Sequence, residues 1–111
     1  MTAEQHYVCE LEEITSGTGV CFKAASEQVA IFRVDNHVFA LGNYDPLSKA
    51  NVLSRGIIGS KDDQWFVASP VYKQRFNLET GVCFDDDSVG VPTYPAHIEN
   101  GKVFITLGAT S

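Results

Sequence analysis

Residues 69–81 read Ser69-Pro70-Val71-Tyr72-Lys73-Gln74-Arg75-Phe76-Asn77-Leu78-Glu79-Thr80-Gly81 and contain the most specific pattern in this chain. The first six residues combine proline with polar residues and lack hydrophobic periodicity, which is typical of a loop. The short, partly apolar run Arg75–Leu78 comes next, followed by the glycine-containing turn Glu79-Thr80-Gly81. This order predicts a loop that leads into a short strand and a tight turn.

Similar short strands are expected on both sides of this segment. Each run is rich in β-branched or aromatic residues, ends at turn residues and is too short for a typical helix. Asp35-Asn36 and Asn100-Gly101 each separate two such runs and predict tight hairpins. The sequence therefore predicts an all-β sandwich or small barrel of short antiparallel strands. The expected strands are His6–Glu10, Val20–Ala24, Gln28–Val34, Val38–Leu41, Gly56–Gly59, Trp65–Ala68, Arg75–Leu78, Val82–Phe84, Pro92–Ile98 and Val103–Leu107.

Between these strands the sequence predicts little regular structure. Leu11–Ile14 is expected to form one helical turn, and residues 42–55 are expected to be mostly loop. Asp85–Gly90 reads as an acidic loop. No long helix is expected, because no window keeps its apolar residues at a spacing of about 3.6.

Composition limits the classes of protein to consider. The chain has 111 residues, of which 44% are hydrophobic, enough for one domain spanning residues 1–111. The formal net charge of −6 argues against a nucleic-acid partner, because phosphate contacts need a basic surface. No apolar run approaches the roughly 20 residues of a membrane span, and the N-terminus does not resemble a signal peptide. We therefore expect a cytoplasmic protein without a membrane partner.

Two segments of the chain resemble the two ligand loops of Rieske iron–sulfur proteins. The second loop of that family runs Cys-Pro-x-His-Gly-x-x-Phe-Asp-x-x-Thr-Gly, and residues 69–81 match it at Pro70, Phe76, Leu78, Thr80 and Gly81. The first loop runs Cys-x-His and then reaches a Leu and a Gly, which correspond to Leu53 and Gly56 within residues 43–56. The resemblance implies a Rieske-like fold with both loops at one end.

The ligand positions themselves depart from the Rieske pattern. A Rieske cluster is held by two cysteine thiolates and two histidine imidazoles. The corresponding positions hold Pro46 and Ser48 in the first loop, and Ser69 and Tyr72 in the second. Proline has no ligating side chain, and neutral hydroxyls are poor substitutes for thiolates and imidazoles. We therefore expect no cofactor, metal or catalytic residue in this chain.

A Rieske-like domain that keeps both loops and lacks all four ligands is similar to one family in particular, the small subunit of the bacterial assimilatory NAD(P)H-dependent nitrite reductase. The stretches Leu53–Gly56 and Ser69–Gln74 resemble that family's version of the loops. The resemblance implies a non-catalytic subunit whose partner is a large subunit. That partner would carry siroheme, an iron–sulfur cluster and FAD, and would use NAD(P)H to reduce nitrite to ammonia.

Other functions remain as alternatives. A Rieske-type, ferredoxin-like electron carrier would need the missing ligands, and a small-molecule-binding β domain would need a sizeable apolar pocket. A separate metal site is disfavoured because Cys9, Cys21 and Cys83 lie 12 and 62 residues apart, without the close pairs of structural zinc sites. We expect these cysteines to be small buried hydrophobic residues.

The two loops are also the expected partner-binding face. Half of the eight basic residues lie in or beside them, namely Lys49, Arg55, Lys73 and Arg75, and Tyr44 and Tyr72 are of the type that anchors interfaces. A competing interpretation pairs the basic residues with Asp85–Asp87. We further expect the loops to be held together by packing of Tyr44, Pro46, Leu47 and Tyr72.

Overall fold

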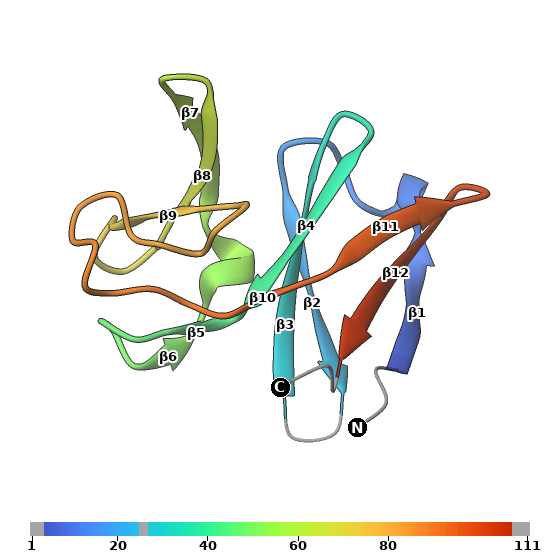
Figure 1. Cartoon of the computed structure of the whole chain (residues 1–111), viewed down its shortest axis with the longest axis horizontal. Coiled ribbons are helices and arrows are strands. Elements are labelled where there is room, and N and C mark those ends of the chain that lie inside the picture. The colour runs from blue at the N-terminus through green and yellow to red at the C-terminus, as the bar shows by residue number, and fades with distance from the viewer. Residues whose placement is uncertain (1–3, 25–26, 108–111) are drawn as a thin grey trace.

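The computed structural model describes residues 4–24 and 27–107, which form an all-β fold of four small antiparallel sheets (Figure 1). Two single 3-10 turns, η1 (Leu11–Glu13) and η2 (Leu53–Arg55), interrupt the strands. The strands are β1 (Glu4–Glu10), β2 (Gly19–Ala24), β3 (Glu27–Val34), β4 (His37–Gly42), β5 (Tyr44–Asp45), β6 (Ala50–Asn51), β7 (Ile57–Lys61), β8 (Gln64–Ala68), β9 (Arg75–Asn77), β10 (Thr93–Tyr94), β11 (Ala96–Glu99) and β12 (Lys102–Leu107). The predicted fold class is confirmed.

The larger part of the fold packs two sheets against each other. One sheet has the order β1-β12-β11 and the other β10-β4-β3-β2. Val29 and Ile31 of β3 pack with Ile14, Val103 and Ile105 in a buried core between these sheets. These side chains are fully excluded from water, so this core is a main source of the fold's stability.

The opposite face of β3 builds a second core. Ala30 and Phe32 alternate with the residues of the first core and pack with Leu53, Val67 and Phe76. Successive strand side chains point to opposite faces, so β3 is buried on both sides from Val29 to Phe32, where its sequence is continuously apolar. The second core connects the larger part of the fold to the sheet β7-β8-β9 and to the β5–β6 hairpin, on the left in Figure 1.

Gly56 is required where η2 passes close to β8. A Cβ atom there would lie 2.4 Å from the carbonyl oxygen of Ala68 and 2.6 Å from Cγ2 of Val67. Only glycine lets two backbone segments approach this closely. The glycine that closes the first loop in the Rieske pattern thus has a packing reason in this chain.

Both predicted hairpins are present. Asp35 has a φ of 54° in the turn between β3 and β4, and Asn100 and Gly101 have φ values of 53° and 74° between β11 and β12. Asp, Asn and Gly tolerate this left-handed backbone better than other residues do. These turns therefore set the registers Val34↔His37 and Glu99↔Lys102.

Three predicted segments differ from the structure. The expected strand Pro92–Ile98 is split at Pro95, which lacks an N–H, so that β10 pairs with β4 while β11 pairs with β12. Val82–Phe84 forms only isolated bridges, Phe76↔Cys83 and Val82↔Gly90, instead of a strand. Residues 42–55 are more ordered than expected, because they contain β5, β6 and η2.

The cysteine prediction is wrong at one position. Cys83 is buried and Cys9 is partly buried, but Cys21 is exposed. Cys21 lies on the edge strand β2 between Val20 and Phe22, which face the first core, so its own side chain points to the other face.

No helix within residues 4–24 and 27–107 is long and apolar enough to cross a membrane. Residues 1–3, which begin the N-terminus compared above with a signal peptide, lie outside the described residues.

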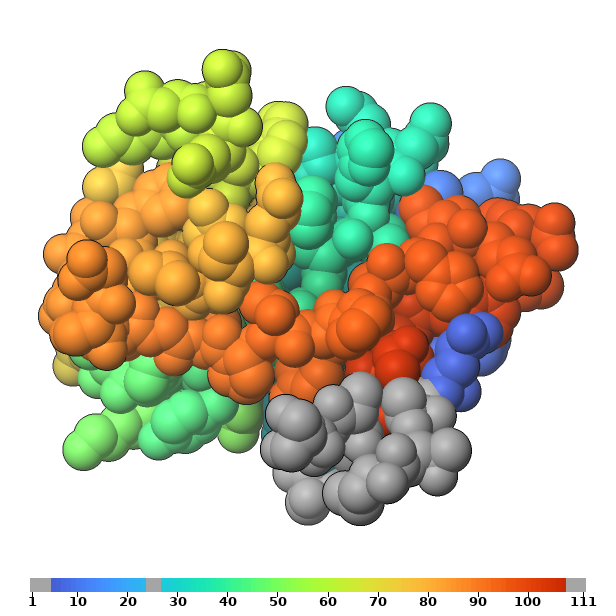
Figure 2. All heavy atoms as spheres, viewed as in Figure 1, coloured from blue at the N-terminus to red at the C-terminus, as the bar shows by residue number. Residues whose placement is uncertain are grey.

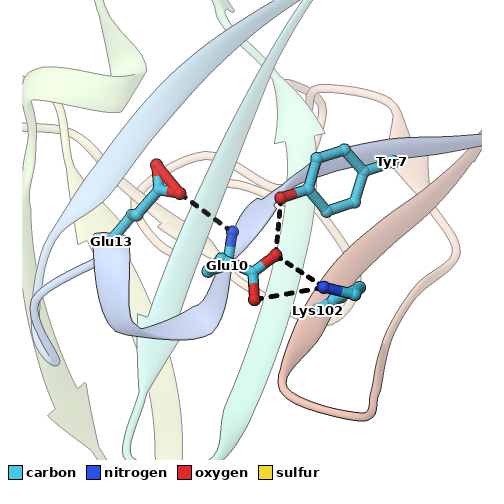
Figure 3. Close-up of polar contacts among 4 residues, drawn as sticks. All are labelled: Tyr7, Glu10, Glu13 and Lys102. Atoms are coloured by element: carbon cyan, nitrogen blue, oxygen red, sulfur yellow. Dashed lines mark hydrogen bonds and ion pairs between the residues drawn. The ribbon is translucent and has the colours of Figure 1, made fainter.

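A polar cluster ties β1 to β12 (Figure 3), two strands that lie on the opposite side of the molecule from β5 and β6 in Figure 1. The Glu10 carboxylate accepts a 2.6 Å hydrogen bond from the Tyr7 hydroxyl and lies 3.1 Å from the Lys102 ammonium. The Glu10 amide donates to Glu13 at 3.3 Å, which closes the start of η1. The hydrogen bond to Glu10 and the neighbouring carboxylate charges raise the pKa of Tyr7 to about 12.

Candidate functional site

The two ligand-type loops contain the same kind of turn. In the first loop the Lys49 amide donates to the Asp45 carbonyl at 2.7 Å, and in the second the Lys73 amide donates to the Ser69 carbonyl at 3.0 Å. Both lysines have left-handed backbone, with φ values of 60° and 66°. Each turn therefore spans five residues and ends on a lysine whose side chain is exposed.

One carboxylate joins these two turns. Asp45 is fully buried, and its Oδ2 accepts hydrogen bonds from the Ser69 hydroxyl at 2.5 Å and from the Ser48 hydroxyl at 2.8 Å. Its Oδ1 accepts from the Leu47 amide at 2.9 Å. Ser48 and Ser69 occupy two of the four ligand positions of the Rieske pattern. We call Asp45, Ser48 and Ser69 the carboxylate clasp.

The clasp favours the ionised form of its carboxylate. Burial by itself would raise the pKa of Asp45, but the hydrogen bonds from Ser69, Leu47 and Ser48 together lower that pKa below its usual value. Hydrogen bonds to an ionised group are shorter and stronger than those between neutral groups. The clasp is therefore a charge-assisted link between loops that are distant in the sequence.

Asn43 makes a second polar link beneath the first loop. It is buried, and its Oδ1 accepts from the Ser54 amide at 2.7 Å while its Nδ2 donates to the Gln28 side chain at 3.2 Å. Its backbone carbonyl accepts from the Leu53 amide at 3.1 Å. Asn43 thereby fixes η2 against β3.

Sequence reasoning missed the roles of Asn43 and Asp45. A signal was present, because Asn43 directly follows the apolar end of β4 and Asp45 lies two residues further, in the segment that carries the closing residues Leu53 and Gly56. Their hydrogen-bond partners, however, lie up to 24 residues away. Spacing alone does not identify such partners.

The residues at the ligand positions do not fit a Rieske cluster. Pro46 offers no donor atom, and the hydroxyls of Ser48 and Ser69 already donate to Asp45. Tyr72 offers a phenol where a neutral imidazole would be needed, and phenols are not ligands of these clusters. Among the described residues, no three side chains of the His, Cys, Asp and Glu types come together as a metal site.

The expected packing of aromatic residues between the loops is wrong. Tyr72 is 58% exposed and Tyr44 is 47% exposed, so neither ring fills the space between the loops. Leu47 is half-buried and packs against the second core, and Pro46 is also half-buried. The loops are joined by the polar clasp instead, which leaves both tyrosines at the surface.

Three of the four basic residues at the loops extend into solvent. Lys49, Arg55 and Lys73 are exposed and make no ion pair with any residue in the described part of the chain. Tyr44 and Tyr72 are also exposed in these loops, and we call the exposed surface of these five residues the loop tip. This surface belongs to a protein whose net charge is −6.

Arg75 differs from the other three. Its guanidinium forms a 2.7 Å ion pair with Asp85 and lies 5.7 Å from the ring centre of Phe66 and 6.0 Å from that of Phe84. The competing interpretation, pairing with the acidic loop, thus applies to this residue. The contacts hold the acidic loop against β8 and β9.

A cleft separates the second loop from the larger sheets. It has a volume of about 400 Å³, is lined by Phe39, Leu78, Glu79 and Tyr94 among others, and is seen as the hollow between the teal and yellow segments in Figure 2. The cleft is open to solvent and has both polar and apolar walls. Its mixed walls differ from the predominantly apolar lining that is typical of small-molecule pockets.

Comparisons with known proteins agree with this architecture. The family model described as Rieske-like [2Fe-2S] domain matches residues 5–106. A nitrite reductase (NADH) small subunit of Salmonella typhimurium is 45% identical over 98 residues, 86% of this chain and 91% of that protein. A Mycobacterium tuberculosis structure named as an NADH-dependent nitrite reductase small subunit has a TM-score of 0.93 and 38% identity, over 99% of this chain and 100% of that one.

A longer relative contains the same unit within a larger chain. The NAD(P)H nitrite reductase large subunit of Klebsiella oxytoca is 40% identical over 98 residues, which cover 88% of this chain and 10% of that protein. The family resemblance found in the sequence is thereby confirmed. This chain belongs to the Rieske-like domain family and, within it, to the nitrite reductase (NADH) small subunits.

Proposed function

We propose that this chain is the non-catalytic small subunit of a cytoplasmic NAD(P)H nitrite reductase that reduces nitrite to ammonia during nitrate and nitrite assimilation. The observation that carries the proposal is the carboxylate clasp, in which Ser48 and Ser69 bind Asp45 at positions where an electron carrier would bind iron. The identity of 45% to a protein named as such a small subunit supports the same assignment.

The partner is the large subunit, and the loop tip is the proposed docking face. Tyr44 and Tyr72 offer exposed rings with a polar end, a residue type enriched at the centres of interfaces. Lys49, Arg55 and Lys73 add exposed positive charge to the same two loops, while Arg75 is paired with Asp85. Docking at this tip would bury apolar rings and pair the lysines at the same time.

The role of this chain is structural in the proposed complex. Siroheme, an iron–sulfur cluster, FAD and the NAD(P)H site belong to the large subunit, where electron transfer and nitrite reduction take place. The small subunit binds and orients its partner through a preformed surface. A preformed surface loses little conformational entropy on binding, which favours a stable complex.

The test is co-purification from nitrite-grown cells. A tagged version of this chain should bring down a large protein with the absorption spectrum of siroheme and flavin, while the isolated chain should be colourless. Failure to recover such a protein would remove the proposed role. An isolated chain with near-stoichiometric iron and a charge-transfer spectrum would instead establish the Rieske-type, ferredoxin-like carrier.

A further inference from the structure

We propose that Asp45 is the positioning residue of the docking face: it locks the two loops in one register, so that Lys49 and Lys73 are presented together to an acidic patch on the large subunit. The inference rests on the proposed function for the identity of the partner. Beyond that function, it identifies Asp45 as the residue that organises the surface and an acidic patch as the surface of the partner.

The first step of the argument is the matching geometry of the two turns. Asp45 begins one turn and Ser69 begins the other, and their carbonyls accept the amides of Lys49 and Lys73 at 2.7 and 3.0 Å. The side chains of the same two residues bond to each other at 2.5 Å. The backbone carbonyls of Asp45 and Ser69 therefore each fix the lysine of their own turn. Their side chains join the two loops to each other.

The second step is the burial of this link. Asp45 and Ser69 are both fully buried, so water does not compete for their hydrogen bond. Ser48 adds a further bond to the same carboxylate from within the first turn. The relative position of the two lysine-bearing turns is thus set by one shielded, charge-assisted contact.

The third step concerns the choice of lysine at strained positions. The Rieske pattern has glycine where this chain has Lys73, and glycine adopts positive φ without a steric penalty. Here Lys73 has a φ of 66° and Lys49 a φ of 60°, conformations that disfavour side chains with a Cβ. The backbone at these two positions therefore does not favour lysine, and what lysine adds there is an exposed positive charge.

The fourth step is charge complementarity. Lys49 and Lys73 make no ion pair with the described residues and stand on a chain of net charge −6. A fixed pair of cations on an acidic protein recognises a partner surface with acidic groups in matching positions, and repels surfaces that are basic there. The occupant of the loop tip is therefore an acidic patch of the large subunit.

Hydrogen exchange of the full chain tests the clasp without the partner. Ser69→Ala removes the hydroxyl of the second loop that donates to Asp45, and we expect faster exchange of the Lys49 amide in the first loop as well as of the Lys73 amide. Asp86→Asn is the matched control, because the Asp86 carboxylate accepts bonds from Ser88 within its own turn. An unchanged Lys49 amide in folded Ser69→Ala would overturn the proposed coupling.

Binding to the purified large subunit at two salt concentrations tests the positioning role. For Asp45→Asn we expect roughly tenfold weaker binding and a smaller salt dependence than for wild type and Asp86→Asn. If Asp45 contributed only to folding, Asp45→Asn would reduce the fraction of chain that is able to bind. The dissociation constant of the folded fraction and its salt dependence would then stay unchanged. That result would overturn the inference. If Asp45→Asn does not fold, Ser69→Ala takes its place, because it keeps the Ser48 and Leu47 bonds.

The two proposals fail in different ways. If the wild-type chain does not bind the large subunit, the proposed function and the named partner are both wrong. Faster hydrogen exchange of the Lys49 amide in Ser69→Ala would still show that the clasp couples the two loops. If wild type binds and Lys49→Glu and Lys73→Glu bind equally well, the small-subunit role stands and the acidic patch is wrong.

Discussion

Ser69 and Asp45 lie 24 residues apart in the chain, and the Ser69 hydroxyl donates a 2.5 Å hydrogen bond to the Asp45 carboxylate. Cluster-bearing members of the Rieske family join these two loops through iron and its four ligands. In this chain a buried carboxylate makes the connection, and its partner hydroxyls come from two of the former ligand positions.

Replacing the carboxylate should lower stability. In Asp45→Asn an amide nitrogen can replace Oδ2, to which the hydroxyls of Ser48 and Ser69 donate, so that donors would face donors. We expect the free energy of unfolding to fall by about 1–3 kcal/mol, the usual effect of leaving a buried polar group unsatisfied. Urea denaturation followed by circular dichroism measures the change.

The control for this variant is Asp86→Asn. Asp86 also accepts from a serine hydroxyl, at 2.6 Å, but it is exposed and its contact stays within one turn. It should change the urea midpoint much less. Equal effects of the two substitutions would show that the clasp contributes no more than an ordinary surface turn.

Stability should also depend on pH through Asp45. Its folded pKa is lower than its usual value of 3.8, so its contribution is fully present above that pH and is lost as the pH falls through the folded pKa. Glu10 and Asp85 have lowered pKa values and act in the same direction. Denaturation between about pH 6 and pH 2 should therefore show a flatter acid limb for Asp45→Asn than for wild type. Parallel curves would exclude Asp45 as a source of acid sensitivity.

Charge reversal at the loop tip should weaken docking without unfolding the chain. Lys49→Glu and Lys73→Glu should each slow association with the large subunit, and the difference should shrink at high salt because exposed charges are screened. Lys102→Glu changes the net charge equally but lies on β12, in the pair with Glu10. Biolayer interferometry compares the three variants, and equal rates for all of them would place the interface elsewhere.

The purified chain should contain no iron. The motivation is the chemistry of Pro46, Ser48, Ser69 and Tyr72, which provide no thiolate or imidazole. Iron analysis after expression under anaerobic, cluster-forming conditions gives the answer, with a Rieske ferredoxin prepared in parallel as the positive control. Iron at two atoms per chain would contradict the donor chemistry described above.

Tyr7 should ionise late in an alkaline titration. Its hydrogen bond to Glu10 raises its pKa to about 12, so the stability linked to Tyr7 is present below its usual value of 10.0 and is lost as the pH rises toward 12 (Figure 3). Burial and the hydrogen bond to Glu27 also raise the pKa of Tyr94 to about 12. The phenolate transition near that pH should therefore be smaller in Tyr7→Phe than in wild type. A transition that stays the same in Tyr7→Phe would assign the late ionisation to another tyrosine.

Much of the fold is predictable because its determinants are local. The hairpin at Asp35-Asn36 follows from residues that accept left-handed backbone, and the dense apolar run of β3 follows from burial on both faces. The break at Pro95 was visible as a proline, yet its consequence depends on which sheets lie on either side. A proline in the sequence shows where a strand is interrupted, but it does not show which sheet the chain joins after the interruption.

The site was predictable in position but not in mechanism. Matching Leu53, Gly56 and Pro70 to the Rieske pattern locates both loops, because glycine and proline positions reflect backbone geometry. The prediction that Tyr72 packs between the loops assumed that apolar contacts replace the cluster, whereas the ring is 58% exposed. The replacement is an ionised group with distant partners, and no local pattern identifies it.

The pairing of Glu4 with Leu107 gives the fold a modular character. The described chain enters and leaves at neighbouring points of one sheet, on the side of the molecule away from the β5–β6 hairpin (Figure 1). Such a unit can be appended to a long polypeptide without distorting its loops, and the Klebsiella oxytoca relative carries it within one large chain. Covalent attachment replaces a bimolecular encounter by a high effective concentration, so a fused copy can tolerate a weaker interface than a separately encoded one.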